Sequence, residues 1–135
     1  MSEFALIFDT GCLILIWLVQ LVIYPSFLFY EVENLKKWHF KYTRMVTLIV
    51  LPLMLGQLIT GIMGAVSEVS LSSIKLVLIL STWAITFTLF VPLHNKIDST
   101  DQIVDVTESL VKRNWIRTGI WSAVFVISLV QHLIL

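Results

Sequence analysis

The sequence predicts an all-α integral membrane four-helix bundle with short interfacial helices on the cytoplasmic side. The chain of 135 residues is 58% hydrophobic and only 13% charged, with a mean hydropathy of +0.92, whereas soluble domains carry about 25% charged residues. Four apolar stretches approach the roughly 20 residues that a membrane-spanning helix needs. They cover about 4–29, 44–66, 74–93 and 115–135, and they make the whole chain, 1–135, one transmembrane domain.

Composition also excludes several classes of protein. A formal net charge of zero gives no basic surface for nucleic acid, so we expect the lipid bilayer as the main partner, with a homo-oligomer or a larger membrane complex possible. The single cysteine, Cys12, cannot form a disulfide scaffold. A soluble enzyme domain of this length could not bury so much apolar surface. Each apolar stretch should be helical, because an isolated strand cannot satisfy its backbone groups in lipid.

The first span is expected to be retained rather than cleaved as a signal peptide. Signal peptides open with positive charge, and here no Lys or Arg precedes Lys36. In the second span Pro52 predicts a kink. Gly56, Thr60 and Gly64 recur every four residues there, a spacing that allows close helix contact. Packing within one chain is the favoured interpretation, and a dimer seam is the alternative.

The two inner connections predict further helices. Residues 31–41 place apolar side chains at helical spacing and are expected to form an interfacial helix. Residues 100–113 place Ile103, Val106 and Leu110 on one face and charges on the other, which predicts an amphipathic helix on the inner membrane surface. A connector helix facing water is the alternative.

Basic residues predict the orientation in the membrane. Of the nine Lys and Arg residues, eight lie in or beside these two connections, and only Lys75 lies on the other side. The positive-inside rule then places both termini on the non-cytoplasmic side of the inner membrane. Pro25 and Pro92 lie near the inner ends of the first and third spans, where a helix can stop at low cost.

The fourth span carries a polar stripe that is expected to face the bundle interior. Its members are Asn114, Arg117, Thr118, Trp121, Phe125, Ser128 and His132. Arg117 is the costliest of them, at roughly 2.5–3.5 kcal/mol on insertion scales, unless it extends to the lipid headgroups. Gln20 and Gln57 are amides within spans that need hydrogen-bond partners. They are candidate ligand-binding residues, together with Tyr24, Tyr42 and Trp121, or else they join helices.

Two histidines raise the question of a cofactor. His39 and His94 come from different segments at similar depth, as bis-histidine haem ligation requires. Zinc would need a third ligand, which Glu31, Glu33 or Asp98 could supply. The favoured expectation is no cofactor and no metal, with haem as a minor alternative. A contact between Asp9 and His132 near the outer ends is conceivable, although side chains at helix ends are more often solvated.

Several fragments together resemble a group of small bacterial four-helix membrane proteins of unknown function. The fragments are QLVIYPSF at 20–27, Trp38-His39 with Tyr42, Pro52–Met54, VPLH at 91–94 and NWIRTGIW at 114–121. More distantly, the piece VPLHNKI at the end of the third span and the piece NWIRT at the start of the fourth are similar to the anthrone-oxygenase-like family. That family's pattern matches Pro92, Asn95, Asn114 and Arg117, and it departs at His94, which stands where an asparagine is expected.

The resemblance implies oxygen insertion into a lipophilic aromatic or quinone-like substrate without metal or flavin. His39 or His94 would then remove a proton, and Arg117 and Asn114 would hold the resulting anion. Topology places these residues and Tyr24 on one side, so we expect one pocket toward the cytoplasmic leaflet, with Arg117 as its only buried cation. The alternatives are a non-enzymatic subunit of a larger complex and a haem-binding electron carrier.

Overall fold

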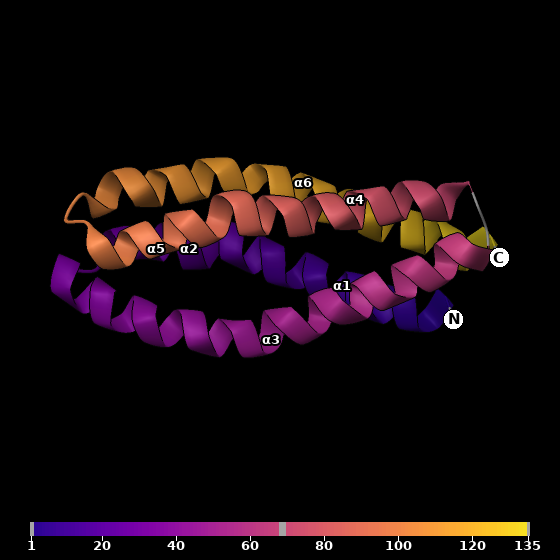
Figure 1. Ribbon diagram of the computed structural model, residues 1–135, viewed down its shortest axis with the longest axis horizontal. Helices are drawn as coiled ribbons and strands as arrows, with labels where there is room; N and C mark the ends of the chain where they lie inside the picture. The colour runs from indigo at the N-terminus through magenta and orange to yellow at the C-terminus, as the bar shows by residue number, and fades with distance from the viewer. Residues whose placement is uncertain (1, 68–69, 135) are drawn as a thin grey trace.

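The computed structural model describes residues 2–67 and 70–134, and these residues form four long helical rods (Figure 1). The first rod consists of α1 (Ser2–Leu18), a π-helical turn η1 (Val19–Ile23), α2 (Tyr24–Ser26) and a 3-10 turn η2 (Phe27–Phe29). The second is α3 (Val32–Ser67). The third consists of α4 (Leu71–Ile85), a second π-helical turn η3 (Thr86–Phe90) and α5 (Val91–Ser99), and the fourth is α6 (Ile103–Ile134). The predicted all-α four-helix bundle is confirmed.

The rods pack around a square. α1 lies against α6 and α3, and α4 lies against the same two helices from the opposite corner. The start of α1 and the end of α6 lie at one end of the bundle, whereas the α2–α3 and α5–α6 connections lie at the other (Figure 1). The bundle therefore has one end with both inner connections, which we call the connection end, and one end with the termini.

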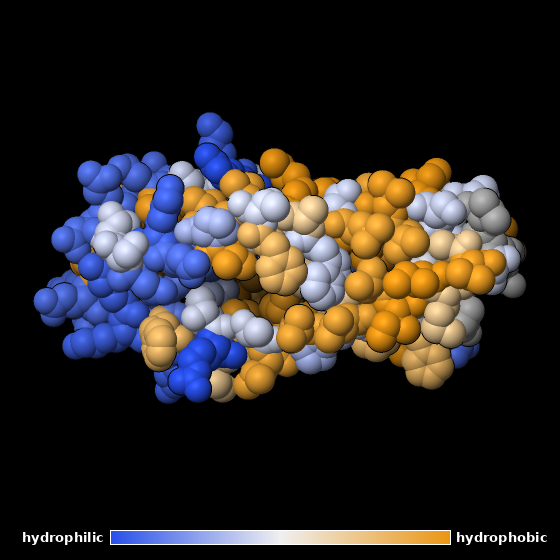
Figure 2. Space-filling view, in the orientation of Figure 1, coloured by the Kyte–Doolittle hydropathy of each residue, from blue (hydrophilic) through white to orange (hydrophobic). Residues whose placement is uncertain are grey.

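All four rods are long and apolar enough to cross a membrane. α3 has 36 residues, which at 1.5 Å per residue makes it about 54 Å long, well beyond a hydrocarbon core of about 30 Å. The surface shows where the excess lies: side chains are hydrophobic over the terminal end and the middle, and hydrophilic over the connection end (Figure 2). The connection end therefore projects beyond the apolar band.

The two expected surface helices are not separate elements. Residues 31–41 are the start of α3, and residues 103–113 are the start of α6. Thr100 Oγ1 accepts a hydrogen bond of 3.1 Å from the Gln102 amide just before α6. Leu35, Ile103 and Leu110 are buried in the core of the bundle rather than laid on a membrane surface. The prediction of separate interfacial helices was wrong: the other rods cover Ile103 and Leu110, and in the segment 31–41 they cover Leu35, whereas Val32 and Trp38 stay exposed.

Each π-helical turn ends two residues before a proline, Pro25 or Pro92. Proline lacks an N–H, and its ring clashes with the carbonyl four residues earlier. Widening the turn before it relieves this conflict: the Tyr24 amide donates to the Val19 carbonyl, and the Val91 amide donates to the Thr86 carbonyl, five residues back in each case. The third rod accordingly continues past Pro92 to Ser99 instead of stopping. α3 runs unbroken through Pro52 and is bowed in its middle, as the predicted kink implies (Figure 1).

Small residues of α3 accept neighbours from the same chain. A Cβ on Gly56 would lie 2.3 Å from Cε1 of Phe8, and one on Gly64 would lie 3.6 Å from Oγ of Ser72. Gly61, outside the predicted pattern, faces Ile79 in the same way. Packing within one chain is therefore confirmed for Gly56 and Gly64.

Candidate functional site

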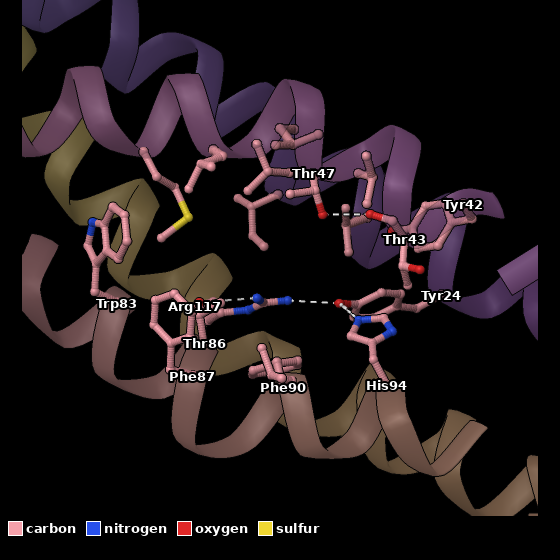
Figure 3. A pocket seen from close by; sticks show the side chains of 18 of the residues that line it. Tyr24, Tyr42, Thr43, Thr47, Trp83, Thr86, Phe87, Phe90, His94 and Arg117 are labelled. Carbon is pink, nitrogen blue, oxygen red and sulfur yellow. Dashed lines mark hydrogen bonds between the residues drawn. The ribbon is translucent and has the colours of Figure 1, made fainter. Parts of the chain in front are cut away.

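A cavity of about 500 Å³ lies between α3 on one side and α4, η3 and α5 on the other. Figure 2 shows the surface hollowed near the border between the hydrophilic end and the hydrophobic band. Exposed residues at the cavity, among them Thr47, Leu51, Phe87 and Val91, belong to the outer surface of the bundle. The cavity walls are mainly apolar. Arg117, Tyr24 and His94 meet at one place inside, whereas Thr43 and Thr47 lie on the α3 wall across the cavity (Figure 3).

Arg117 of α6 points into the bundle rather than toward the headgroups. Its residue surface is only 7% exposed. Nη2 donates 2.9 Å to the Tyr24 hydroxyl, and Nε and Nη2 donate 2.9 and 2.7 Å to Oδ1 of Asn114. The guanidinium carbon lies 3.5 Å from the centre of the Phe90 ring, a cation–π contact. A weaker bond of 3.4 Å joins Nη1 to Thr86. These contacts hold a planar cation with one face against an aromatic ring.

The two π-helical turns position several of the residues that surround Arg117. Phe90 and Thr86 lie at the two ends of η3, and Gln20 lies in η1. Gln20 Oε1 accepts 2.9 Å from Asn114 and 3.1 Å from the Thr118 hydroxyl, so it fixes the amide that holds Arg117. Asn114 and Gln20 are fully enclosed behind Arg117 and do not line the cavity. Both residues therefore position the cation instead of facing a ligand.

A chain of hydrogen bonds leads from Arg117 toward the connection end. The Tyr24 hydroxyl lies 2.9 Å from Nε2 of His94, and Nδ1 of His94 lies 2.7 Å from Nε2 of His39. Nδ1 of His39 lies 2.9 Å from Oδ1 of Asp98. His39 is completely buried, whereas the Asp98 side chain is 42% exposed. The chain thus joins Arg117 at the floor of the cavity to Asp98, an exposed carboxylate that also lines the cavity.

Sequence reasoning considered Asp98 only as a metal ligand and missed its part in this chain. The signal was present, because Asp98 follows His94 by four residues and therefore shares its helix face. The Tyr42 ring packs against both imidazoles, with ring centres 6.0 and 6.4 Å away. His39, His94, Tyr24 and Tyr42 thus meet in one cluster.

In this structure the facing nitrogens of the two histidines bond to each other and not to a shared metal. Two nitrogens bound at about 2.0 Å to one metal ion lie about 3.3 Å apart in a tetrahedral zinc site and about 4 Å apart on opposite sides of a haem iron. Here the facing nitrogens are 2.7 Å apart and share a hydrogen bond. The rings are also nearly parallel, with centres 5.0 Å apart. Among residues 2–67 and 70–134, no group of three or more His, Cys, Asp and Glu side chains is arranged to hold a metal ion.

A second polar cluster lies nearer the termini. Asp9 pairs with Lys75 at 2.6 Å and accepts 2.8 Å from Nε2 of Gln57. The Ser128 hydroxyl bonds to both members of the ion pair. Oε1 of Gln57 accepts 2.9 Å from the indole of Trp121. Gln57 and Trp121, both candidate ligand-binding residues, thus belong to this cluster, although Trp121 also lines the cavity.

This cluster adds a second buried cation and corrects one expectation. Lys75 is buried, at 4% exposure, but it does not line the cavity, where Arg117 is the one Lys or Arg among the described lining residues, as expected. Asp9 pairs with Lys75 and not with His132, which lies exposed near the end of α6. The charges were expected at the solvated ends of their helices, yet side chains from all four rods enclose them.

The predicted stripe on α6 is correct in its inner half and drifts in its outer half. Apart from Thr118, which is also buried, the buried positions alternate in steps of four and three: 103, 107, 110, 114, 117, 121, 124 and 128. That spacing is a repeat of 3.5 residues, typical of helices that supercoil to the left. The prediction that Phe125 and His132 face the bundle interior assumed a straight helix. Phe125 is half-buried, and Val124 occupies the interior position instead.

Comparison with protein-family models, curated proteins and solved structures found no match to this chain.

Proposed function

We propose that this protein is a small enzyme of the inner membrane that acts on a lipophilic aromatic or quinone-like substrate. Its connection end would face the cytoplasm, in line with the eight basic residues gathered there, and both termini would lie outside. The observation that carries the proposal is Arg117, buried at the polar end of an apolar cavity and bonded to Tyr24, which in turn contacts His94.

The cavity suits such a substrate in size and character. A volume of about 500 Å³ falls within the range of roughly 300–1,000 Å³ that is typical of small-molecule sites. Apolar walls favour an aromatic body, and the exposed lining residues include the apolar Leu51, Phe87 and Val91 as well as the polar Asn95 and Asp98 nearer the connection end. A membrane-dissolved molecule can then enter sideways and bring one polar oxygen to the guanidinium.

Arg117 and its neighbours supply the chemistry. A guanidinium is a permanent cation with a planar set of donors, suited to an oxygen anion. His94 lines the cavity and is the nearer candidate base, directly or through the Tyr24 hydroxyl, whereas His39 lies behind it. Asn114, proposed from the sequence to hold the anion, instead holds Arg117 in place.

The resemblance to anthrone oxygenases supports oxygen insertion as the reaction. Loss of one proton from an activated ring CH2 gives an anion whose charge rests on the oxygen near Arg117. Dioxygen then bonds to the ring carbon, and the proton returned to the peroxide forms a hydroperoxide. Loss of water leaves a ketone, so that CH2 and O2 become C=O and H2O. No metal or flavin enters this balance.

The test is dioxygen uptake by the purified protein in lipid nanodiscs with anthrone as the probe. Uptake should exceed that of empty nanodiscs, and Arg117→Ala should lower it by about 100-fold, the size of effect seen when an oxyanion donor is removed. Arg117→Lys should retain only part of the wild-type dioxygen uptake, because lysine lacks the planar set of donors that a guanidinium has. Lys112→Ala, an exposed cation five residues earlier on α6, is the matched control. Uptake equal to that of empty nanodiscs would reject the oxygenase and favour the subunit role.

A further inference from the structure

We infer that Tyr24, His94, His39 and Asp98 form a proton wire of fixed direction, which carries the proton of the cavity to Asp98 at the connection end. The inference rests on the proposed function for its use in catalysis. The direction of the wire rests only on the hydrogen bonds themselves. Asp98 is its exit residue, a role that neither the resemblance nor the sequence pattern assigns.

The direction follows from the two ends. A carboxylate can only accept a hydrogen bond, so Nδ1 of His39 carries the hydrogen that faces Asp98. In a neutral imidazole the other nitrogen is then an acceptor, and Nε2 of His39 accepts from Nδ1 of His94. By the same rule Nε2 of His94 accepts from the Tyr24 hydroxyl.

The other end agrees with this direction. Arg117 can only donate, and it donates 2.9 Å to the Tyr24 oxygen, which leaves the tyrosine hydrogen free to point at His94. Every hydrogen in the wire thus points toward Asp98. Both histidines must carry their hydrogen on Nδ1, and this is a property that can be measured directly.

Transfer of one proton moves each hydrogen by one bond. The substrate's proton joins the Tyr24 oxygen as the tyrosine hydrogen passes to Nε2 of His94. The Nδ1 hydrogen of His94 passes to Nε2 of His39, and the Nδ1 hydrogen of His39 passes to Asp98. The substrate keeps the electron pair as an anion beside Arg117, and the exposed Asp98 carboxyl releases the proton to water.

The wire does not continue toward the termini among the described residues. The next groups beyond Tyr24 are Arg117 and Trp121, whose cation–ring distance is 6.0 Å. Both groups only donate, and the Trp121 indole already donates to Gln57. A donor that cannot accept does not relay a proton. The cavity can therefore exchange protons with the connection end without opening a path across the membrane to the Asp9–Lys75 pair.

The test is nitrogen NMR of the whole protein in nanodiscs, labelled with 15N histidine and without substrate. The chain has three histidines, so single His→Gln variants assign the signals. We expect His39 and His94 to carry hydrogen on Nδ1 in the wild type. Asp98→Ala should let both tautomers appear at His39, whereas Asp105→Ala, an exposed inner-side acid outside the wire, should leave them unchanged. Hydrogen on Nε2 in the wild type, or tautomers indifferent to Asp98→Ala, would overturn the inference.

Chemical rescue tests the exit role separately from a structural one. With anthrone as substrate, Asp98→Ala should lower dioxygen uptake at least tenfold, and added formate should restore part of it by accepting the proton in place of the carboxylate. A loss that formate does not relieve would mean that Asp98 only positions His39. If the tautomers are as expected and no uptake occurs even in the wild type, the proposed function fails while the direction of the wire stands. Uptake with the opposite tautomers would reject the wire alone.

Discussion

Replacement of Lys75 by methionine is expected to destabilise the bundle by several kcal/mol, because it leaves the buried Asp9 carboxylate without its counter-ion. The two charges are 2.6 Å apart, and both residues are at most 4% exposed. At an effective dielectric constant near 20, charges this close attract by about 6 kcal/mol. Part of this is offset by the cost of removing both from water, and breaking such a pair from one side typically costs about 3–5 kcal/mol. We expect Lys75→Met to fall in that range.

The double variant separates the ion pair from packing. Asp9→Leu combined with Lys75→Met removes both charges, so it should be more stable than Lys75→Met alone by at least about 1 kcal/mol. The double variant should still be less stable than the wild type, because Gln57 and Ser128 lose their carboxylate partner. Lys96→Met, an exposed lysine on α5, is the control and should change little. The assay is reversible unfolding in mixed micelles followed by circular dichroism. A Lys75→Met protein as stable as Lys96→Met would refute the reasoning.

Two further predictions concern packing and pH. Gly56→Ala should destabilise the bundle by about 1–3 kcal/mol, the usual cost of overpacking, because the new Cβ would lie 2.3 Å from the Phe8 ring. Gly119→Ala, with open space around it, is the control and should not destabilise the bundle. Equal effects of the two substitutions in the same unfolding assay would contradict this prediction. At the connection end, a 2.8 Å hydrogen bond from Lys36 lowers the pKa of Asp101 below its usual range. The stabilisation from this pair is therefore fully present at a pH above the ordinary pKa of aspartate, and it is lost as the pH falls through the lowered pKa of Asp101. Lys36→Met should raise the pKa of Asp101 in a carboxyl-carbon NMR titration, and an unchanged midpoint would show that the bond is absent in lipid.

The sequence alone predicted the spans and much of the inner polar cluster. Hydropathy over about 20 residues is a strong signal for spans. The inner ends of the spans place Tyr24, His39, His94 and Arg117 at one level, and the structure brings them together. Their order along the hydrogen-bond chain could not be predicted, because it depends on which side chains meet across rods far apart in the sequence.

The features that were missed depend on local geometry or on long-range pairing. The π-helical turns arise before Pro25 and Pro92, but a proline also permits a helix end, and the sequence does not decide between the two. Charges near span ends usually reach water, so nothing local indicated that Asp9 and Lys75 would pair inside. The drift of the α6 stripe follows from supercoiling, which is a property of the assembled bundle.

The most direct test of the account is whether Arg117 holds the oxygen of a lipophilic ligand. The chain has three arginines, Arg44, Arg113 and Arg117, so a protein labelled with 15N arginine gives three side-chain Nε signals, and the other two serve as controls in the same sample. Anthrone is added to the protein in nanodiscs without oxygen, to prevent turnover. We expect that the Arg117 signal shifts and saturates, while the signals of Arg44 and Arg113 stay in place. An Arg117 signal that does not move up to the solubility limit of anthrone in the lipid, or equal shifts at all three arginines, would contradict it.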